Sequence, residues 1–470
     1  MTERPGSASF DRIIDRERGL RQTLSARRIS MIAIGGAIGT GLFLGSGFAI
    51  SLAGPAVLVS YLIGAVVALL LMGCLAEMTV AHPTSGSFGA YAEHYLGPLA
   101  GFLVRYAYWT SIVLAVGTEV TAIALYMRYW FPAAPGWPWI VGFSALLVLV
   151  NVRSVNVFGA TEYWFSAIKV TAIVLFIVLA AYILIAAGGT GAGPGAGFGN
   201  YTAHGGFFPH GAWGVWTAVI VAIFSYLSIE MIAVAAGDAE HPEIAIARAF
   251  RSTVVRLILF YLLTLALVLA VVPWTDAGVD ESPFVKVMRA LRVPAAAGIF
   301  NFVILVAALS AMNSQLYITT RMMFSLSRAG YAPRRFGLLN RHGVPVQALL
   351  LSSLGIALAT AVSVLAPNSA FILMISISSF GAMFTWMMIF VTHYAFRRAR
   401  LRAGAPPRLA LPGYPLTTLL GAALMAAVLI TTAFTPAFRL TLVFGLPFLA
   451  ALSLLYRLRY ARINLARSRE

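Results

Sequence analysis

Hydrophobic segments long enough to cross a lipid bilayer recur along the whole chain and constrain its fold more than any other feature. A membrane-spanning helix needs about 20 apolar residues, and hydropathy predicts twelve such segments in the 470 residues. Backbone exposed to lipid must satisfy its own hydrogen bonds, so each segment is expected to be helical. The sequence therefore predicts an all-α integral membrane protein with spans at 29–51, 55–81, 98–128, 137–152, 160–187, 213–237, 253–273, 294–327, 346–366, 369–396, 414–434 and 438–457.

The composition supports a polytopic membrane protein. Hydrophobic residues make up 60% of the chain and charged residues only 10%, whereas a soluble domain carries about 25% charge. The single cysteine, Cys74, lies within a predicted span, so an intrachain disulfide is excluded. Residues 1–28 are polar and charged, unlike a signal peptide.

The net charge of +17 follows membrane topology and does not indicate nucleic-acid binding. Most basic residues fall in the two tails and in alternate loops. The loops of the opposite side carry only Arg128, Lys286, Arg289, Arg292 and Arg439. The positive-inside rule therefore predicts that both termini are cytoplasmic, as an even number of spans requires.

The sequence predicts one membrane domain with short polar additions. Residues 1–28 and 458–470 are expected to be cytoplasmic tails. The external stretch 188–212 is rich in glycine, so we expect a flexible linker there and no site.

The first span, "IAIGGAIGTGLFLGSG" over residues 32–47, has six glycines between Gly35 and Gly47. One interpretation is close helix packing through GxxxG pairs. The other is a discontinuous helix whose unwound backbone lines a cavity. A dinucleotide-binding fingerprint is excluded because Leu44 occupies its last required position and no strand precedes it.

The sixth span carries an ionisable residue, Glu230, beside Ser225, Tyr226 and Ser228. A carboxylate inside a membrane is costly and is a functional hypothesis by default. The alternative is a structural glutamate whose oxygens accept hydrogen bonds from neighbouring helices. The first and sixth spans stand five helices apart, as a five-helix inverted repeat requires.

Lys169 lies in the fifth span, about nine residues or roughly 13 Å into the helix. The chain has only two lysines among its 33 basic residues. Arginine keeps its proton, whereas a buried lysine can lose it. Lys169 is therefore predicted to be a proton switch, with a permanently charged structural cation as the alternative.

Further polar residues lie within the predicted spans. Glu119 in the third span either faces a substrate cavity or braces its helix against the tenth. Asn313, Ser314 and Arg321 in the eighth span are predicted to make interhelical hydrogen bonds. Ser378 and Ser379 in the tenth span are candidate cavity residues.

Several motifs resemble a known family. They are "RRISMIAIGGAIGTGLFLGSG", "SYLIGAVVALLLMGCLAEM" with "PTSGSFGAYAEHYLGP", "EYWFSAIKV", and "AAGDAEHPEIAIARAF" followed by "RLILFY". Together they resemble the bacterial amino-acid permeases of the amino acid transporter family, in the amino acid–polyamine–organocation superfamily. The resemblance covers roughly residues 25–400. It implies the leucine-transporter fold: a 5+5 inverted repeat over 29–187 and 213–396, two further helices over 414–457, and broken first and sixth helices.

The resemblance also implies a substrate site at the two helix breaks. The backbone of Gly39, Thr40 and Gly41 would bind the substrate carboxylate, and carbonyl groups of Ile38 and near Leu227 would bind its amino group. Phe224 occupies the position of an aromatic gate. Ser225, Glu230 and Glu119 complete the predicted substrate site.

Two positions depart from the family pattern. A third position, Lys169, supports the coupling hypothesis. Ser228 replaces a glycine that many relatives have in the sixth helix, and Asp238 replaces a glutamate. Relatives place the lysine equivalent to Lys169 where sodium-coupled members hold a cation between the first and eighth helices. Protonation could then substitute for the metal ion.

No enzyme or channel pattern competes with this interpretation. The sequence has no HExxH, GxSxG or Walker A motif, and no repeated pore helix. We therefore expect a proton-coupled amino-acid symporter of the inner membrane, with an exchanger or uniporter of the same fold as the alternative. No cofactor other than the coupling proton, no metal and no nucleic acid are expected; the partners are an amino acid and the lipid bilayer, and a monomer should suffice for transport.

Overall fold

The computed structural model describes residues 7–17, 31–32, 35–153, 155–186, 197–235, 242–276, 278, 280–290, 295–366 and 368–460. Within these ranges the chain is helical and contains no strand, so the predicted all-α class is confirmed. Nine helical stretches of this part are long and apolar enough to cross a membrane. Shorter apolar helices occupy the predicted fourth and seventh spans.

The predicted spans correspond closely to the helices of the structure. The first half of the chain contains α1 (Ser7–Glu17), α3 (Thr40–Phe43), α4 (Gly45–Ala53), α5 (Val57–Ala81), α6 (Ser87–Leu96), α7 (Pro98–Arg128), α8 (Trp137–Arg153) and α9 (Val155–Ala186). The second half contains α10 (Gly211–Tyr226), α11 (Met231–Ala235), α12 (Pro242–Val271), α13 (Pro283–Ala290), α14 (Ala296–Arg328), α15 (Val346–Ser352), α16 (Leu354–Leu365), α17 (Ala370–Arg402), α18 (Leu416–Thr431) and α19 (Arg439–Leu455).

Both the first and the sixth spans are interrupted. In the first, helical residues 35–37 are followed by non-helical Ile38 and Gly39, and α3 then begins at Thr40. In the sixth, α10 ends at Tyr226 and α11 begins at Met231, with four turn residues between them. The structure therefore confirms the broken-helix interpretation of the glycines.

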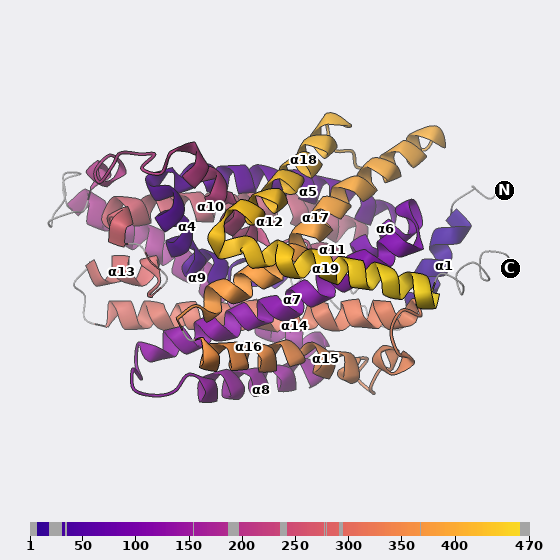
Figure 1. Ribbon diagram of the computed structural model, residues 1–470, viewed down its shortest axis with the longest axis horizontal. Helices are drawn as coiled ribbons and strands as arrows, with labels where there is room; N and C mark the ends of the chain where they lie inside the picture. Colours follow the sequence, from indigo (N-terminus) through magenta and orange to yellow (C-terminus); the bar gives the residue numbers. More distant parts are fainter. Residues whose placement is uncertain are drawn as a thin grey trace.

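Helices that are five spans apart in the chain pack against one another. α4 contacts α10, α5 contacts α12, and α7 contacts α14. α7 also packs along α17, which places it at the centre of the bundle (Figure 1). This pairing fits the predicted inverted repeat, which stays a prediction, and both helix breaks lie in the interior.

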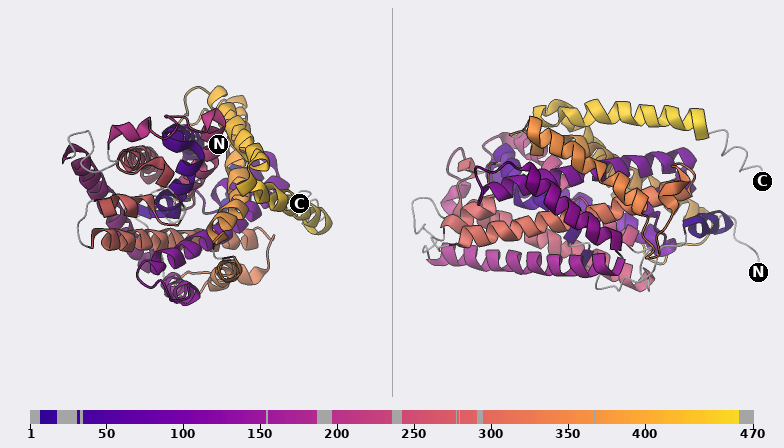
Figure 2. Two further views of the ribbon diagram at one scale, coloured as in Figure 1. Left: turned by 60° about the vertical axis from the view of Figure 1, so that its left-hand side comes forward. Right: turned by 90° about the horizontal axis from the view of Figure 1, so that it is seen from below.

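The bundle has two distinct ends (Figures 1 and 2). α1, α6 and the C-terminal end of α19 lie together at one end, here called the tail end. α13 and the start of α14 lie at the other, here called the α13 end. α9 begins at the tail end, because α7 and α8 cross the bundle once in each direction before it.

Two of the helices that extend beyond their predicted spans do so into arginine-rich sequence. α12 begins at Pro242, before the predicted 253, and α17 runs to Arg402, beyond the predicted 396. The added residues are rich in arginine, because each helix continues past the apolar section that hydropathy detects.

The structure corrects the expectation of a plain flexible linker over 188–212. Residues 187–196 lie outside the described part of the chain, but the following segment packs on α12. The Gly197 N–H donates to the Ala270 carbonyl at 2.7 Å, and the Tyr201 hydroxyl donates to the Ala266 carbonyl at 2.7 Å. Phe198–Tyr201 forms a 3₁₀ turn there. Composition did not reveal these contacts because they depend on a helix about 70 residues away.

The predicted N-terminal tail likewise contains a packed helix, α1. Its Phe10 is buried against the rings of His82 and His94, with centroid distances of 4.1 and 5.3 Å. The Arg16 guanidinium donates to both oxygens of Glu93 at 2.8 and 2.6 Å. α1 is therefore docked on α6 and α14 at the tail end.

Candidate functional site

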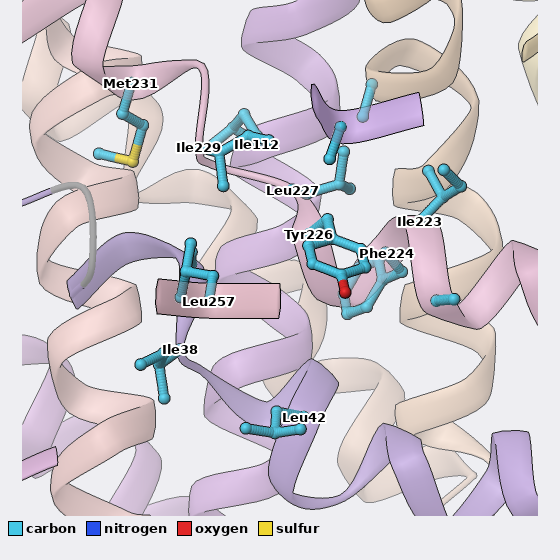
Figure 3. Close-up of a cluster of buried hydrophobic side chains, with 14 of the residues drawn as sticks. Ile38, Leu42, Ile112, Ile223, Phe224, Tyr226, Leu227, Ile229, Met231 and Leu257 are labelled. Atoms are coloured by element: carbon cyan, nitrogen blue, oxygen red, sulfur yellow. The ribbon is translucent and has the colours of Figure 1, made fainter. Parts of the chain in front are cut away.

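A small cavity of about 20 Å³ lies where the first and sixth helices are interrupted. The first helix, the end of α10, α7 and α14 form its walls. Its lining comprises Gly36, Ala37, Gly39, Gly41, Ile112, Ala115, Glu119, Phe224, Ser225, Leu227, Ser228 and Gln315. Figure 3 shows Phe224 and Tyr226 at the end of the α10 coil and Leu227 on the unwound segment beyond it. A volume of this size holds about one water molecule, so the site is closed.

The break in the first helix exposes both backbone donors and backbone acceptors. The Thr40 N–H donates to Glu119 Oε2 at 3.4 Å. The Ala37 carbonyl accepts from the Tyr261 hydroxyl at 2.6 Å. Lys169 Nζ donates to the carbonyl of Gly35 and, at 3.1 Å, to that of Ile38. The unwound segment is thus held by side chains of three other helices.

The break in the sixth helix is held by Glu230. This side chain is fully buried. Its carboxylate accepts from the Ser228 N–H at 3.2 Å, the Tyr108 hydroxyl at 2.6 Å and Trp386 Nε1 at 3.1 Å. Ser228 has φ 77°, in the left-handed region that favours glycine, so a glycine here would be less strained. The departure from the family pattern at this position therefore stores some backbone strain beside the cavity.

Two hydroxyl groups join the two breaks. Ser225 Oγ donates to the Gly41 carbonyl at 2.9 Å and lies 2.9 Å from the Tyr61 hydroxyl. The Tyr261 hydroxyl, which donates to Ala37, also lies 2.8 Å from the Ser225 carbonyl. The first and sixth helices are therefore cross-linked by hydrogen bonds on the α12 side of the cavity.

The glycines of the first helix permit close approach of neighbouring groups. A Cβ at Gly41 would lie 2.9 Å from Ser225 Cα, and one at Gly39 would lie 2.8 Å from Ala311 Cβ. A Cβ at Gly36 would lie 2.7 Å from Met231 Sδ. These separations are shorter than van der Waals contacts allow, so a side chain at any of the three positions would push the neighbouring groups apart.

Most of the predicted substrate-binding residues meet at this cavity. Gly39, Gly41, Glu119, Phe224, Ser225 and Leu227 line it. The Ile38 carbonyl faces Lys169 instead, and the Thr40 N–H faces Glu119. The substrate roles assigned to these residues stay predictions, as does the role of Glu230.

Gln315 of α14 is a cavity residue that the sequence did not single out. Its Oε1 is buried and has no hydrogen-bond partner among the described residues. Buried amide oxygens usually accept a hydrogen bond, so this oxygen is a candidate acceptor for a donor group in the cavity. No motif marked it, because glutamine is common on packed membrane helices.

Two buried glutamates also escaped the sequence reasoning. Glu162 of α9 accepts hydrogen bonds from Ser310 and, at 2.9 Å, from Asn313 Nδ2. Glu77 of α5 accepts from His393 Nε2 at 3.0 Å, Arg397 at 2.5 Å and the Leu411 N–H at 2.9 Å. Both lie near the ends of predicted spans, where hydropathy does not distinguish a buried carboxylate from one at the membrane interface. Their full burial was the missing signal.

The other candidate residues lie elsewhere. The hydroxyls of Ser378 and Ser379 both donate to the Ile375 carbonyl of their own helix, α17. Asn313 makes the predicted interhelical bonds, since it also accepts from Asn151 Nδ2 at 2.8 Å. Asp238 lies outside the described residues. Within those residues no three His, Cys, Asp or Glu side chains are placed to hold a metal ion.

A larger cavity opens at the α13 end, and a cluster of charged groups lies at the tail end. The former has a volume of about 490 Å³ and is lined by Leu44, Tyr126, Arg128, Glu281 and Asn301, among others. At the tail end, Glu93 is buried beneath α1. Its burial opposes ionisation, but Arg105, at 2.7 Å, and Arg16 outweigh that effect and lower the pKa of Glu93 to about 2.

The sequence is similar to curated transport proteins over nearly its full length. Residues 28–457 match the family model described as Amino acid permease. The chain is 39% identical to the amino-acid permease RocC of Bacillus subtilis, over 91% of this chain and 92% of the relative. It is 37% identical to the aromatic amino acid transport protein AroP of Escherichia coli K12, over 89% and 91%. YtnA of B. subtilis, an uncharacterized amino acid permease, is 37% identical over 96% and 98%.

Proposed function

Because the chain belongs to the amino acid permease family, we propose that it imports an amino acid by proton-coupled symport with alternating access. Its relatives are permeases, so the chain is a membrane transporter and not an enzyme. The observation that carries the proposed coupling is the position of Lys169, a buried cation whose ammonium holds the unwound first helix.

Lys169 couples protonation to the shape of the substrate site. A protonated lysine offers three N–H donors and a positive charge to carbonyl oxygens, whereas a neutral amine offers fewer donors and no charge. Release of the proton weakens the contacts with Gly35 and Ile38. Since Gly36, Ala37 and Gly39 line the cavity, loosening this segment lowers the affinity for substrate.

The substrate α-carboxylate binds the backbone N–H groups of residues 39–41. The Thr40 N–H now donates to Glu119, so the carboxylate of Glu119 occupies the direction from which a substrate carboxylate would approach. Two carboxylates cannot share this place while both are charged. Substrate binding therefore requires Glu119 to bind a proton or to turn away.

The substrate amino group binds acceptors on the other side of the cavity. Gln315 Oε1 has no partner within the described residues, and carbonyls of the unwound segments near Leu227 lie close to it on the cavity wall. Since the closed cavity has room for about one water molecule, Phe224 and Leu227 must move to admit a substrate side chain. These two residues and Ile112 are the side chains that would set specificity.

The membrane orientation follows from charge. Arg16, Arg153, Arg328 and Arg402 end their helices at the tail end, which favours a cytoplasmic tail end in the inner membrane with both termini inside. The larger cavity at the α13 end then opens to the exterior. In the proposed transport cycle this external cavity is the entry route for the substrate.

Transport by the purified protein in liposomes tests the proposal. Vesicles that are alkaline inside and contain no amino acid should accumulate a labelled substrate above its external concentration, and a protonophore should abolish the accumulation. A panel of unlabelled competitors, starting with the aromatic amino acids named for AroP, would identify the substrate.

The alternative is an exchanger or a uniporter of the same fold. An exchanger would take up label only when the vesicles are preloaded with amino acid, and a uniporter would only equilibrate it. Uptake that never exceeds equilibration under a pH gradient would refute proton-coupled symport.

A further inference from the structure

Glu162 is fully buried within the helix bundle. Its Oε1 accepts from the Ser310 hydroxyl, and its Oε2 accepts from Asn313 Nδ2 at 2.9 Å. Asn313 in turn accepts from Asn151 of α8 at 2.8 Å. The carboxylate therefore joins α9 to α14 and α8 through uncharged donors, and no arginine or lysine bonds to it directly among the described residues. Burying a carboxylate that no cation bonds directly costs free energy. Its presence here therefore suggests a function.

The same carboxylate touches the segment of the first helix that Lys169 holds. A Cβ on Gly35 would lie 2.0 Å from Glu162 Oε1 and 2.4 Å from Ser166 Oγ. The carboxylate thus packs against the Cα of Gly35, and the carbonyl of this residue accepts from Lys169 Nζ. Only glycine fits between the two charged side chains.

Glu162 and Lys169 also share one face of α9. A separation of seven residues is two helical turns, so both side chains point toward the first helix. Because α9 begins at the tail end, Glu162 lies on the tail side of Lys169. The titratable neighbours of this pair are few: Glu119 of α7 lies on the cavity side of Lys169, and Ser310, Asn313 and Asn151 carry no charge.

We propose that Glu162 is the residue that accepts the coupling proton from Lys169 and passes it toward the tail end. This inference rests on the proposed proton-coupled transport. In the step, one N–H bond of the lysine ammonium breaks and one O–H bond of the Glu162 carboxyl forms, which leaves a neutral amine and a neutral carboxylic acid. The net charge of the pair is zero before and after, so the transfer creates no isolated charge in the membrane.

The consequence is that the bonds from α9 to the first helix and the bonds from α9 to α14 weaken together. The neutral amine holds the Gly35 and Ile38 carbonyls less firmly. The protonated carboxyl becomes a donor and a weaker acceptor, so its bonds to Ser310 and Asn313 must rearrange. The first helix is then released from α9 at the moment when the proton leaves toward the cytoplasm.

The test is Glu162→Gln, which keeps the volume and one acceptor oxygen but cannot bind a proton. In liposomes this variant should lose accumulation driven by a pH gradient and proton uptake with substrate, measured by a trapped pH dye. Counterflow of labelled substrate should survive with a flattened pH dependence. Glu162→Asp keeps a titratable group and should restore gradient-driven accumulation with a shifted pH profile.

Ser310→Ala is the matched control. It removes a hydrogen bond to the same carboxylate without removing the titratable group, so it should lower stability while proton coupling persists. In the Lys169→Ala background, Glu162→Gln should cause no further loss of coupling, because both residues carry one proton pathway.

Two results would overturn the inference. One is gradient-driven accumulation with a normal pH profile in Glu162→Gln. The other is loss of coupling in Ser310→Ala as complete as in Glu162→Gln, which would assign Glu162 a structural role. If Glu162→Gln fails to fold, an uncoupled but folded Glu162→Asp would likewise reject it. A wild-type protein that never accumulates substrate would instead reject the proposed symport itself.

Discussion

Replacement of Gly41 by alanine should weaken substrate binding without preventing membrane insertion. The added Cβ would lie 2.9 Å from Ser225 Cα and 3.3 Å from both Phe224 Cδ1 and Ser225 Oγ. Carbon atoms pack at about 3.5–4.0 Å, so α10 and the first helix must separate by roughly 0.6 Å or more. The nearest atom belongs to the backbone, so no side-chain rotation can relieve the contact.

The magnitude follows from the cost of overpacking. Inserting a methyl group into a close-packed site costs about 1–3 kcal/mol. If Gly41 and Ser225 stay this close in the substrate-bound arrangement and separate in the open one, the cost falls on the bound state and the substrate Kd rises roughly 5- to 150-fold. The separation also lengthens the 2.9 Å bond between Ser225 Oγ and the Gly41 carbonyl. Gly41→Leu adds three further carbon atoms and should abolish binding.

The assay is equilibrium binding of labelled substrate to purified protein, with counterflow uptake as a second measure. Gly45→Ala is the matched control in the same span, since its Cβ would lie no closer than 3.6 Å to a neighbouring atom. Gly142→Ala, whose Cβ would have no atom within 4 Å, controls for helix propensity on a different helix. A Kd for Gly41→Ala within twofold of the Gly45→Ala value would refute the reasoning, because the close approach of the two breaks would then not matter for binding.

Other variants test the remaining assignments. Lys169→Ala and Lys169→Arg should both lose accumulation driven by a pH gradient, because neither side chain releases and regains a proton during the cycle. Counterflow should persist in part. Normal accumulation by the arginine variant would make Lys169 a fixed structural cation. Glu119→Gln should change substrate affinity more than expression, and normal affinity would favour a bracing role. Glu230→Gln, which weakens three hydrogen bonds, should instead lower the yield and melting temperature of the protein; unchanged thermal stability with altered affinity would place Glu230 in the cavity. The ion pair of Arg16 with Glu93 should be insensitive to pH between 5 and 8, because the pKa of Glu93 is lowered to about 2. Its stabilisation is lost only as the pH falls below the usual carboxyl range toward 2. The rate of limited proteolysis of α1 should therefore be constant between pH 5 and 8 and should rise in Arg16→Ala.

The helix breaks were predictable because the sequence marks them locally. Glycines at 35, 36, 39 and 41 are costly in a membrane helix unless the backbone must unwind or approach a neighbour. Lys169 was recognisable for a similar reason, since a lone lysine deep in an apolar segment contradicts its surroundings. Signals of this kind are contained in one stretch of the chain. In the structure Gly36, Gly39 and Gly41 line the cavity, and Lys169 binds the carbonyls of Gly35 and Ile38 beside it.

Glu162 and Gln315 were not predictable in the same way. Glu162 stands three residues from the start of a predicted span, where hydropathy cannot distinguish an interfacial carboxylate from a buried one. Its hydrogen-bond partners Ser310 and Asn313 belong to α14, about 150 residues later in the chain. The docking of α1 has the same origin, because the partners of Phe10 and Arg16 are His82, just after α5, and His94 and Glu93 on α6. Single-chain periodicity carries no information on which helices become neighbours.

The hydroxyl of Tyr261 has a mechanical consequence for any rocking of the bundle. It carries a single proton but lies within hydrogen-bond distance of two carbonyls, at 2.6 Å from Ala37 and 2.8 Å from Ser225. When the sixth helix swings relative to the first, the proton can swivel to whichever carbonyl remains close. The movement then forfeits at most one partial hydrogen bond, a net cost of about 0.5–1.5 kcal/mol, and the buried oxygen is never left without a partner. If the proposed alternating access changes the angle between these two segments, Tyr261 can therefore keep them linked, whereas phenylalanine at this position would leave both buried carbonyls without this donor.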